Sequence, residues 1–185
     1  MRRLAAILLP LALVLCLIVV VWWVGRISLE HSQNNVIQAA AVRYEVDPAL
    51  IKAVIWRESR FDPTAQGTAG ELGLMQLQEI AAQEWADAEQ VRPFSHLQCL
   101  DPQTNVLAGT FYLEKLLRRY RHTDNPIPYA LADYNAGRSH VLKWNHDEAA
   151  TNSALFIEQI GFPLTRQYVI EVMKRAEGYR RQFAR

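Results

Sequence analysis

The spacing of apolar and polar positions divides the chain into an unbroken apolar run and a longer part with helical periodicity. Residues 4–24 are apolar throughout. As a helix, this run is long enough to cross the hydrocarbon layer of a membrane, which is about 30 Å thick. Beyond it, apolar residues recur at helical spacing, and no segment alternates with period two. The pattern therefore predicts a membrane-spanning helix followed by a domain that is all-α or nearly so.

The apolar run is interpreted as an uncleaved signal anchor, residues 1–26, rather than as a cleaved signal peptide. It is longer than the core of a typical signal peptide, and residues 22–26 (WWVGR) offer no small-x-small cleavage site. Arg2 and Arg3 favour a cytoplasmic N-terminus, weakly opposed by Arg26. We therefore expect a single pass through the cytoplasmic membrane, with the rest of the protein on the extracytoplasmic (periplasmic) side. Cleavage of the segment is the alternative.

The polar part is predicted to consist of a short stalk, residues 27–34, and one helical domain, residues 35–185. Residues 86–100 show no clear pattern, and we expect a loop there. Helices are predicted at residues 35–44, 48–60, 73–85, 102–120, 126–135, 139–144 and 165–180.

Two of these helices have the same sequence at their start, an Asp followed by a Pro. Asp47 and Asp101 can cap the free backbone N–H groups, while Pro48 and Pro102 suit the first helical position. Gly109 lies within the apolar stripe of the helix predicted at 102–120. A small residue there predicts that another helix crosses closely.

Glu58 is the most informative charged residue, because it falls on the apolar stripe of its predicted helix. It follows Ile55 by three residues and Val54 by four, so its side chain should point toward the core or the wall of a cleft. A carboxyl group there is poorly solvated, which raises its pKa and suits a general acid near neutral pH. The alternative is a helix-edge residue that pairs with Arg57 or Arg60 at the surface.

Composition and charge exclude several classes of function. The chain has 20 Lys and Arg against 19 Asp and Glu, and without the three arginines beside the apolar run 17 remain against 19. This balance provides no basic field for nucleic-acid binding. Cys16 lies in the apolar run and Cys99 in the domain, so no internal disulfide is expected. The five histidines are scattered, without acidic or cysteine neighbours at ligand spacing, and the sequence predicts neither a metal site nor a cofactor.

Five short blocks follow one another along the domain. They are ESRFDP at residues 58–63, GELGLMQL at 70–77, DPQTNVLAG at 101–109, ALADYNAG at 130–137 and TRQYV at 165–169. Together, in this order and at these spacings, they resemble the lytic transglycosylase (SLT) domain, found in bacterial relatives of goose-type lysozyme. The resemblance covers about residues 34–179, nearly the whole polar part. It implies an all-α, lysozyme-like fold.

The resemblance also implies a reaction. SLT domains cleave the β-1,4 bond between N-acetylmuramic acid and N-acetylglucosamine in peptidoglycan without net addition of water. By its place in the first block, Glu58 would be the single general acid and base. It would protonate the glycosidic oxygen and then take the proton of the muramyl C6 hydroxyl, which leaves a 1,6-anhydro end. The substrate's own N-acetyl group supports the intermediate, so the scheme departs from the two carboxylates of most glycosidases.

The same blocks supply five candidate substrate-binding residues: Met75, Gln76, Tyr134, Asn135 and Tyr168. Met75 and Gln76 offer a flexible apolar surface and an amide for an acetamido sugar, and the two tyrosines offer ring faces and hydroxyl groups. By its place in the last block, Tyr168 is expected to orient the catalytic carboxyl through a hydrogen bond. Met75 could equally belong to the core, and Asn135 could merely cap its helix.

The chain departs from the pattern of the family at two positions. Gly67 stands where the family often has a Ser in the loop after the catalytic helix, which leaves the role of that Ser open here. Leu164 stands where many members have a Glu before the C-terminal Thr-Arg, so a sugar or peptide contact from that position is missing.

Two other functions remain open from the sequence. A hydrolytic muramidase on the same fold would need another carboxylate to activate water, and Asp62, Glu71 and Asp133 are the candidates, although each is also explained as a local cap or surface charge. A non-catalytic peptidoglycan-binding component of the envelope would not need Glu58. The expected partners are the glycan strands of peptidoglycan and, through the N-terminal helix, the cell membrane. The sequence identifies no protein partner.

Overall fold

The structure, a computed structural model, describes residues 2–183, without the side chains of residues 2–13, 22, 26 and 27. The side chains of Arg2, Arg3 and Arg26, on which the expected orientation in the membrane rests, therefore lie outside the described part. The same holds for most of the apolar run on which the signal anchor was predicted. The division into anchor, stalk and domain stays a prediction.

The all-α prediction is confirmed for the described chain. Between residues 2 and 183, β-structure is limited to two isolated bridges, Gln66 with Leu72 and Leu72 with Leu77. The helices are α1 (Arg2–Ser32), α2 (Asn34–Tyr44), α3 (Pro48–Glu58), α4 (Glu79–Ala88), α5 (Pro102–Arg119), α6 (Pro126–Ala136), α7 (Arg138–Trp144), α8 (Ser153–Gln159) and α9 (Pro163–Phe183), with two short 3-10 helices, η1 (His96–Leu100) and η2 (Asp147–Ala150).

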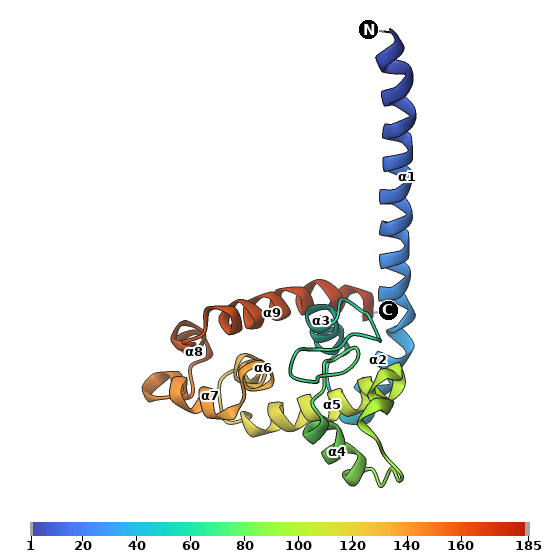
Figure 1. The fold of residues 1–185 in the computed structure, drawn as a ribbon. Helices are drawn as coiled ribbons and strands as arrows, with labels where there is room; N and C mark the ends of the chain where they lie inside the picture. Colours follow the sequence, from blue (N-terminus) through green and yellow to red (C-terminus); the bar gives the residue numbers. More distant parts are fainter. Residues whose placement is uncertain (1, 184–185) are drawn as a thin grey trace.

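α1 leaves the domain as a long rod, and the stalk residues up to Ser32 continue its helix (Figure 1). Within the domain, α9 and α5 run along opposite sides, with α3 and α6 between them (Figure 1). α3 packs mainly against α9, and α6 packs against both α5 and α9. The end of α9 lies beside the junction of α1 and α2. One hydrophobic core joins the helices of the domain from α2 to α9.

α3 is the central helix of this core. As predicted, Asp47 caps it, and its Oδ1 accepts a hydrogen bond from the backbone N of Ala49 at 2.8 Å. All residues from 49 to 55 are buried, so the helix is covered on every side rather than on one apolar face. Only its last turn, which ends at Glu58, approaches a cleft.

Lys52 lies inside this buried stretch, with a side chain that is 0 % exposed. Its Nζ donates to Asn34 Oδ1 and Gln182 Oε1, each at 2.8 Å, and lies 3.7 Å from Glu30 Oε1. A buried ammonium group needs such partners, because its hydration is lost. Lys52 therefore ties the end of α1, the start of α2 and the end of α9 to the central helix.

The helix predicted at residues 73–85 is wrong in its first half, because α4 begins only at Glu79. Gly73 and Gln76 have φ angles of +74° and +47°. Such angles do not occur in a right-handed helix. The apolar spacing of Leu74 and Leu77 arises from a buried loop instead, and both side chains lie in the core.

This loop is held by the side chain of Asn105, which is 0 % exposed on α5. Asn105 Oδ1 accepts from the backbone N of Met75, and its Nδ2 donates to the carbonyl oxygens of Leu72 and Cys99, all at 2.8 Å. A side chain from a distant helix thus supplies hydrogen bonds that a local helix would have made. A Cβ at Gly73 would collide with this amide and with the Cys99 carbonyl.

The remaining differences from the predicted elements are small. The segment predicted as a loop at 86–100 contains the last turn of α4 and the 3-10 helix η1. Gly109 does allow a close approach, but the side chain of Met75 rather than another helix packs on it. η2 and α8 were not predicted. η2 has four residues, too few to show a helical period, and α8 has a single buried residue, Phe156.

Candidate functional site

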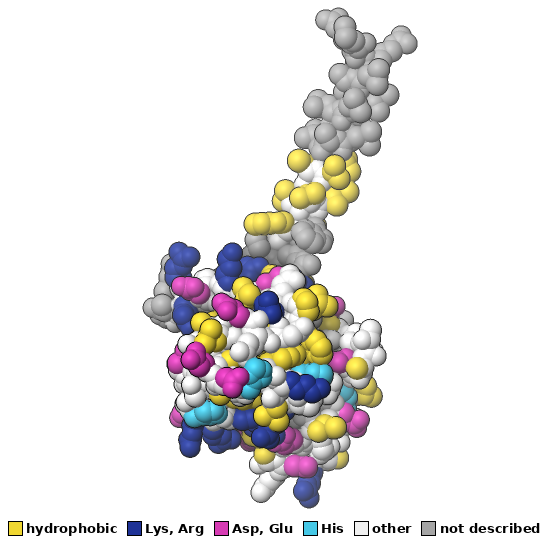
Figure 2. Space-filling view, turned by 90° about the vertical axis from the view of Figure 1, so that its left-hand side faces the viewer, with side chains coloured by type: hydrophobic (Ala, Val, Ile, Leu, Met, Phe, Trp, Pro, Cys, Tyr) yellow, Lys and Arg dark blue, Asp and Glu magenta, His cyan; other side chains and the backbone are white. Residues whose placement is uncertain are grey.

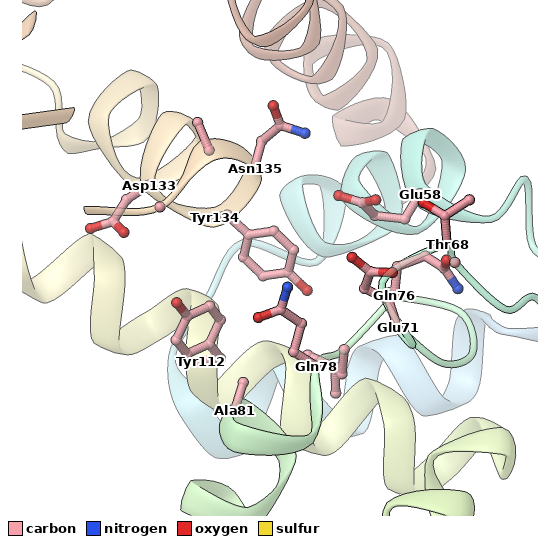
Figure 3. A pocket seen from close by; sticks show the side chains of 14 residues that line it. Glu58, Thr68, Glu71, Gln76, Gln78, Ala81, Tyr112, Asp133, Tyr134 and Asn135 are labelled. Carbon is pink, nitrogen blue, oxygen red and sulfur yellow. The ribbon is translucent and has the colours of Figure 1, made fainter. Parts of the chain in front are cut away.

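A cleft of about 480 Å³ opens beside the last turn of α3 (Figure 3). Its walls come from the end of α3, the loop that follows it, the start of α4, one turn of α5 and the end of α6. The lining residues are Glu58, Gly67, Thr68, Glu71, Gln76, Leu77, Gln78, Ala81, Tyr112, Asp133, Tyr134, Asn135, Ala136 and Gly137.

Glu58 points into this cleft from the end of α3 (Figure 3). Its Oε1 accepts a hydrogen bond of 2.6 Å from the hydroxyl group of Tyr168 on α9. Burial raises the pKa of Glu58 to about 7, although the hydrogen bond from Tyr168 and the charge of Arg57 lower it, and the charge of Glu71 raises it further. A carboxyl group with such a pKa holds its proton near neutral pH and can also release it.

The surface ion pair considered for Glu58 is not present. Arg57 pairs instead with Glu171 of α9, with its Nε 3.0 Å from Oε2. The guanidinium group of Arg60 lies over the ring of Trp56, 3.6 Å from the centroid. Glu58 therefore lines the cleft, while the ion pair of Arg57 is made with Glu171.

The loop below Glu58 is fastened to the end of α3. The hydroxyl group of Ser59 donates to the carbonyl oxygen of Leu74 at 2.8 Å. Gln76 lines the cleft, and its Nε2 donates to the carbonyl oxygens of Ala65 and Gly73 at 3.1 and 2.9 Å. Because both amide hydrogens are used within the loop, Gln76 presents its oxygen as the group left for a ligand.

Met75 does not line the cleft, contrary to the expectation of a substrate contact. Its side chain is 0 % exposed and packs on Gly109 of α5. Its backbone still shapes the site, because its carbonyl oxygen accepts a hydrogen bond of 2.8 Å from the hydroxyl group of Tyr134. Met75 thus belongs to the core beneath the cleft, the alternative that the sequence left open.

Tyr134 and Asn135 reach the cleft from the end of α6, opposite Glu58 (Figure 3). The ring of Tyr134 packs against Tyr112 at a centroid distance of 5.5 Å, which fixes its position. Asn135 Oδ1 accepts from the hydroxyl group of Thr165 at 2.8 Å, so its Nδ2 is left to donate into the cleft. Gly137, with φ of +84°, ends the helix directly behind them.

Tyr168 lies outside the lining of the cleft, behind Glu58. It is 1 % exposed, and burial raises the pKa of its hydroxyl group well above the usual value. The phenol therefore stays protonated and acts as a hydrogen-bond donor. The geometry agrees with the expected contact between Tyr168 and Glu58.

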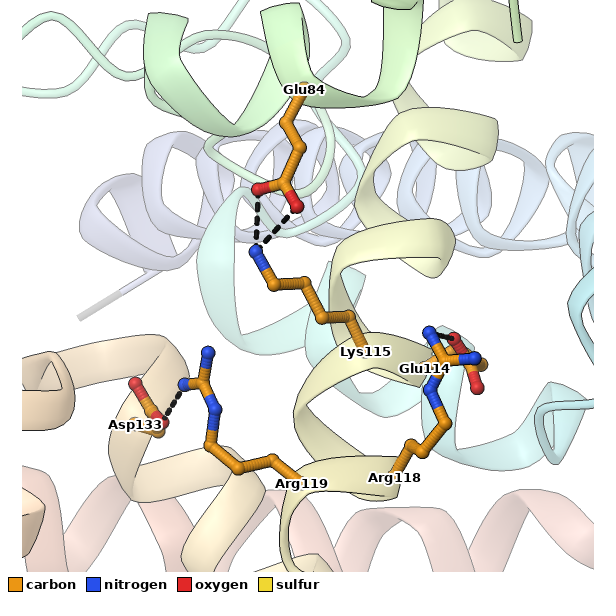
Figure 4. Close-up of polar contacts among 6 residues, drawn as sticks. All are labelled: Glu84, Glu114, Lys115, Arg118, Arg119 and Asp133. Atoms are coloured by element: carbon orange, nitrogen blue, oxygen red, sulfur yellow. Dashed lines mark hydrogen bonds and ion pairs between the residues drawn. The ribbon is translucent and has the colours of Figure 1, made fainter. Parts of the chain in front are cut away.

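The three acidic residues considered for water activation are placed very differently. Asp62 is exposed and caps the backbone N of Thr64 at 2.8 Å. Asp133 is 2 % exposed, and its Oδ2 accepts from Arg119 Nη1 at 2.6 Å (Figure 4). The same oxygen accepts from the Tyr120 hydroxyl group at 2.7 Å. Arg119 and Asp133 form a core ion pair of α5 and α6. Glu71 lines the cleft from the same loop as Gln76 and, unlike Asp133, forms no ion pair among the described side chains.

Several lining residues were missed by the sequence reasoning. Tyr112 lies among apolar residues on α5, Ala81 is a small apolar residue of α4, and Gln78 precedes α4 without any pattern. No local signal distinguishes them. Leu164, one of the two departures, is 76 % exposed and does not line the cleft.

Comparison with known proteins gives a family for this fold. The model of the family described as "Transglycosylase SLT domain" matches residues 35–157, which is more than half of the chain. The chain belongs to the transglycosylase SLT domain family. The matched region of the SLT domain includes α3, the loop after it, and Tyr134 and Asn135 at the end of α6.

Relatives of the SLT domain are named lytic murein transglycosylases. This chain is 39 % identical over 108 residues to the membrane-bound lytic murein transglycosylase F of Desulfosudis oleivorans. The match covers 57 % of this chain and 22 % of that protein. The chain is 32 % identical over 138 residues to the soluble lytic murein transglycosylase of Escherichia coli K12, covering 74 % of this chain and 21 % of that protein.

The fold of the SLT domain is similar to solved structures. One is the lytic transglycosylase Slt of Pseudomonas aeruginosa, crystallised as an inactive glutamate-to-glutamine mutant. The TM-score is 0.74 at 28 % identity, and the match covers 81 % of this chain and 24 % of that one. The chain thus spans less than a quarter of the length of these relatives.

Membrane association has support from two sides. Some relatives are named membrane-bound. In this chain, one helix near the start of the described residues is long and apolar enough, by length and composition, to cross a membrane.

Replacing Tyr168 by Phe is expected to raise the pKa of Glu58 further. The substitution removes the hydrogen bond that stabilises the charged carboxylate and leaves the burial in place. The midpoint of the Glu58 titration, followed by carbon NMR of the side-chain carboxyl, should move to higher pH. A Tyr112→Phe variant serves as control, because no hydrogen bond joins Tyr112 to Glu58. An unchanged midpoint in Tyr168→Phe would contradict the role assigned to this contact.

Proposed function

We propose that this chain is a peptidoglycan lytic transglycosylase, which cleaves the β-1,4 bond between N-acetylmuramic acid and N-acetylglucosamine and forms 1,6-anhydromuramyl ends. The observation that carries the proposal is the buried carboxyl of Glu58, held by Tyr168 at 2.6 Å, with a pKa of about 7, beside an open cleft. The names of the relatives support it. So does the inactivity of a glutamate-to-glutamine mutant in one similar structure.

In the proposed reaction, Glu58 acts first as acid and then as base. Its Oε1 is bound by Tyr168, so the proton is carried by Oε2 on the side of the cleft. Glu58 gives this proton to the glycosidic oxygen as the bond to C1 breaks. The ionised carboxylate then takes the proton of the muramyl C6 hydroxyl while that oxygen bonds to C1. Glu58 ends protonated, and no water is consumed.

The proposed substrate contacts follow from the groups that the cleft leaves free. Gln76 offers its amide oxygen, which suits the N–H of an acetamido group, and Asn135 offers its Nδ2 as a donor. The ring face of Tyr134 suits the apolar face of a sugar. Tyr168 positions Glu58, and no substrate contact is assigned to the side chain of Met75.

We also propose that residues 1–26 anchor the chain in the cytoplasmic membrane as a single pass, with residues 27–34 as the stalk and the catalytic domain, residues 35–185, on the periplasmic side. The described apolar side chains of α1 are exposed and stand clear of the domain (Figure 2). Lys52 supports a fixed distance between membrane and cleft, because it binds the end of α1 and α2 to the central helix.

The test is the analysis of products released from purified peptidoglycan by the full chain. Mass spectrometry should find muropeptides with anhydro ends, each lighter by one water than the corresponding reducing end. Products with reducing ends only would show a hydrolytic muramidase and overturn the proposal. The absence of any soluble product, with binding to the glycan intact, would indicate a non-catalytic binding protein.

A further inference from the structure

Glu71 is the acidic residue of the cleft that the proposed mechanism does not use. Three acids line the cleft, and of these Asp133 is engaged by Arg119 and Tyr120. Glu71 Oε2 accepts a single hydrogen bond of 3.0 Å, from the backbone N of Ala69. Among the side chains that the structure describes, no Lys or Arg forms an ion pair with it. Its negative charge is therefore not neutralised by the protein.

The carboxylate of Glu71 is positioned by the loop that carries it. The backbone of the residue is fixed, because the N of Gly67 donates to the carbonyl oxygen of Glu71 at 2.8 Å and the next residue bridges to Gln66. A Cβ at Gly67 would collide with Oε2 of Glu71 and would also come too close to the amide oxygen of Gln76. Because Gly67 has no side chain, the carboxylate of Glu71 has room to lie across the loop.

Glu58 and Glu71 lie on the same side of the cleft, facing Tyr134 and Asn135 (Figure 3). The other groups that act electrostatically on Glu58 come from α3 and α9. The charge of Arg57 and the hydroxyl group of Tyr168 both favour its ionised form. Glu71 is the opposing charge, and it favours the protonated form.

A fixed anion at this place suits the chemistry of glycoside cleavage. The transition state carries positive charge on the sugar ring. A carboxylate that is already oriented toward it stabilises that charge without any reorganisation during the reaction. The same anion disfavours early loss of the proton from a neighbouring acid.

We propose that Glu71 is a second working carboxylate of this cleft, which stabilises the cationic sugar in the transition state and keeps the proton on Glu58 until it is transferred. The inference rests on the transglycosylase function proposed above and adds a residue to it. It requires no additional bond-making step, because Glu71 neither gives nor takes a proton.

The test is Glu71→Gln in the full chain, assayed on purified peptidoglycan across a range of pH. Gln has the same shape and can still accept the hydrogen bond from Ala69, so the loop should keep its structure. We expect kcat to fall by about tenfold or more. Without the opposing charge the pKa of Glu58 falls, so the loss of kcat/KM on the alkaline side should move to lower pH. The products should still carry anhydro ends.

Two further variants make the result decisive. Glu71→Asp keeps the charge and should retain more activity than Glu71→Gln, with the alkaline limb closer to that of the unmodified protein. Glu177→Gln removes the same charge from an exposed position on α9 and should leave both kcat and the pH profile unchanged. Equal losses in Glu71→Asp and Glu71→Gln would assign Glu71 a merely structural role and overturn the inference.

Other outcomes also overturn it. An unchanged kcat and pH profile in Glu71→Gln would show that its charge does not act on the reaction. A third outcome is that the unmodified protein releases products with reducing ends and Glu71→Gln does not. This result would show that Glu71 activates water instead. The proposed function itself fails differently, through full activity of Glu58→Gln or through the absence of cleavage by the unmodified chain.

Discussion

Glu58→Gln is expected to lower the rate of peptidoglycan cleavage by about 10⁴-fold while binding of the glycan is retained. Gln keeps the shape of the side chain and can accept the hydrogen bond from Tyr168, but it can neither give nor take the transferred proton. General acid–base catalysis contributes up to about 10⁴-fold, and here one group performs both steps. Release of soluble muropeptides measures the rate, and co-sedimentation with insoluble peptidoglycan measures binding.

The Glu177→Gln variant controls for the loss of one negative charge at an exposed site. If Glu58→Gln cleaved peptidoglycan at the rate of the unmodified protein, the assignment of Glu58 as acid and base would be wrong. Loss of binding together with cleavage would instead show that the substitution disturbs the cleft.

The same variant should change how stability depends on pH. The pKa of Glu58 is about 7 in the folded protein, against an ordinary value of 4.5, mainly because of burial. The unfolded chain therefore releases this proton at lower pH than the folded one. The contribution of Glu58 to the free energy of unfolding is greatest below pH 4.5 and falls as the pH rises through 7. Glu58→Gln removes this fall, so it should unfold at higher temperature than the unmodified protein at pH 8.

Asn105→Ala should destabilise the domain by about 3 kcal/mol and abolish cleavage. The substitution removes the side-chain partner of two buried backbone groups, the N of Met75 and the carbonyl oxygen of Cys99. It also removes one of the two hydrogen bonds to the Leu72 carbonyl oxygen, which keeps the one from the N of Leu77. Each unsatisfied buried group costs about 1 to 3 kcal/mol, and water that enters the space recovers part of it. Denaturant unfolding measures the stability, and hydrogen exchange at residues 72–77 measures the local opening.

Gln103→Ala is the matched control, since Gln103 is exposed on the same helix and makes no hydrogen bond to the loop. It should leave stability and exchange within about 0.5 kcal/mol of the unmodified protein. Unchanged exchange at residues 72–77 in Asn105→Ala would mean that the loop holds its shape without this side chain.

The helices with local start signals were predictable because their information is local. Asp47 and Asp101 cap α3 and α5 through hydrogen bonds that span two or three residues. The position of Glu58 on the stripe of α3 likewise follows from helical spacing alone. In each case a few neighbouring residues determine the geometry, so the sequence suffices.

The loop at residues 73–78 shows the opposite case. Its apolar spacing matches a helix, but Asn105, about thirty positions away, supplies hydrogen bonds that favour a loop with positive φ. The same loop carries Met75 into the core and Gln76 into the cleft. One of these adjacent residues is therefore a core residue and the other a cleft residue. Helical spacing of the sequence could not distinguish the two positions.

The sequence by itself determined the all-α class, the caps of the main helices, the family-like blocks and Glu58 as the central acid. Only the tertiary structure decided that Lys52 is buried and bound on three sides, that Asp133 belongs to an ion pair, and that Glu71 faces the cleft. The physical reason is that burial and charge pairing depend on which distant segments meet. Local spacing determines on which face of its helix a side chain lies. The residues that bury it or neutralise its charge come from elsewhere in the chain.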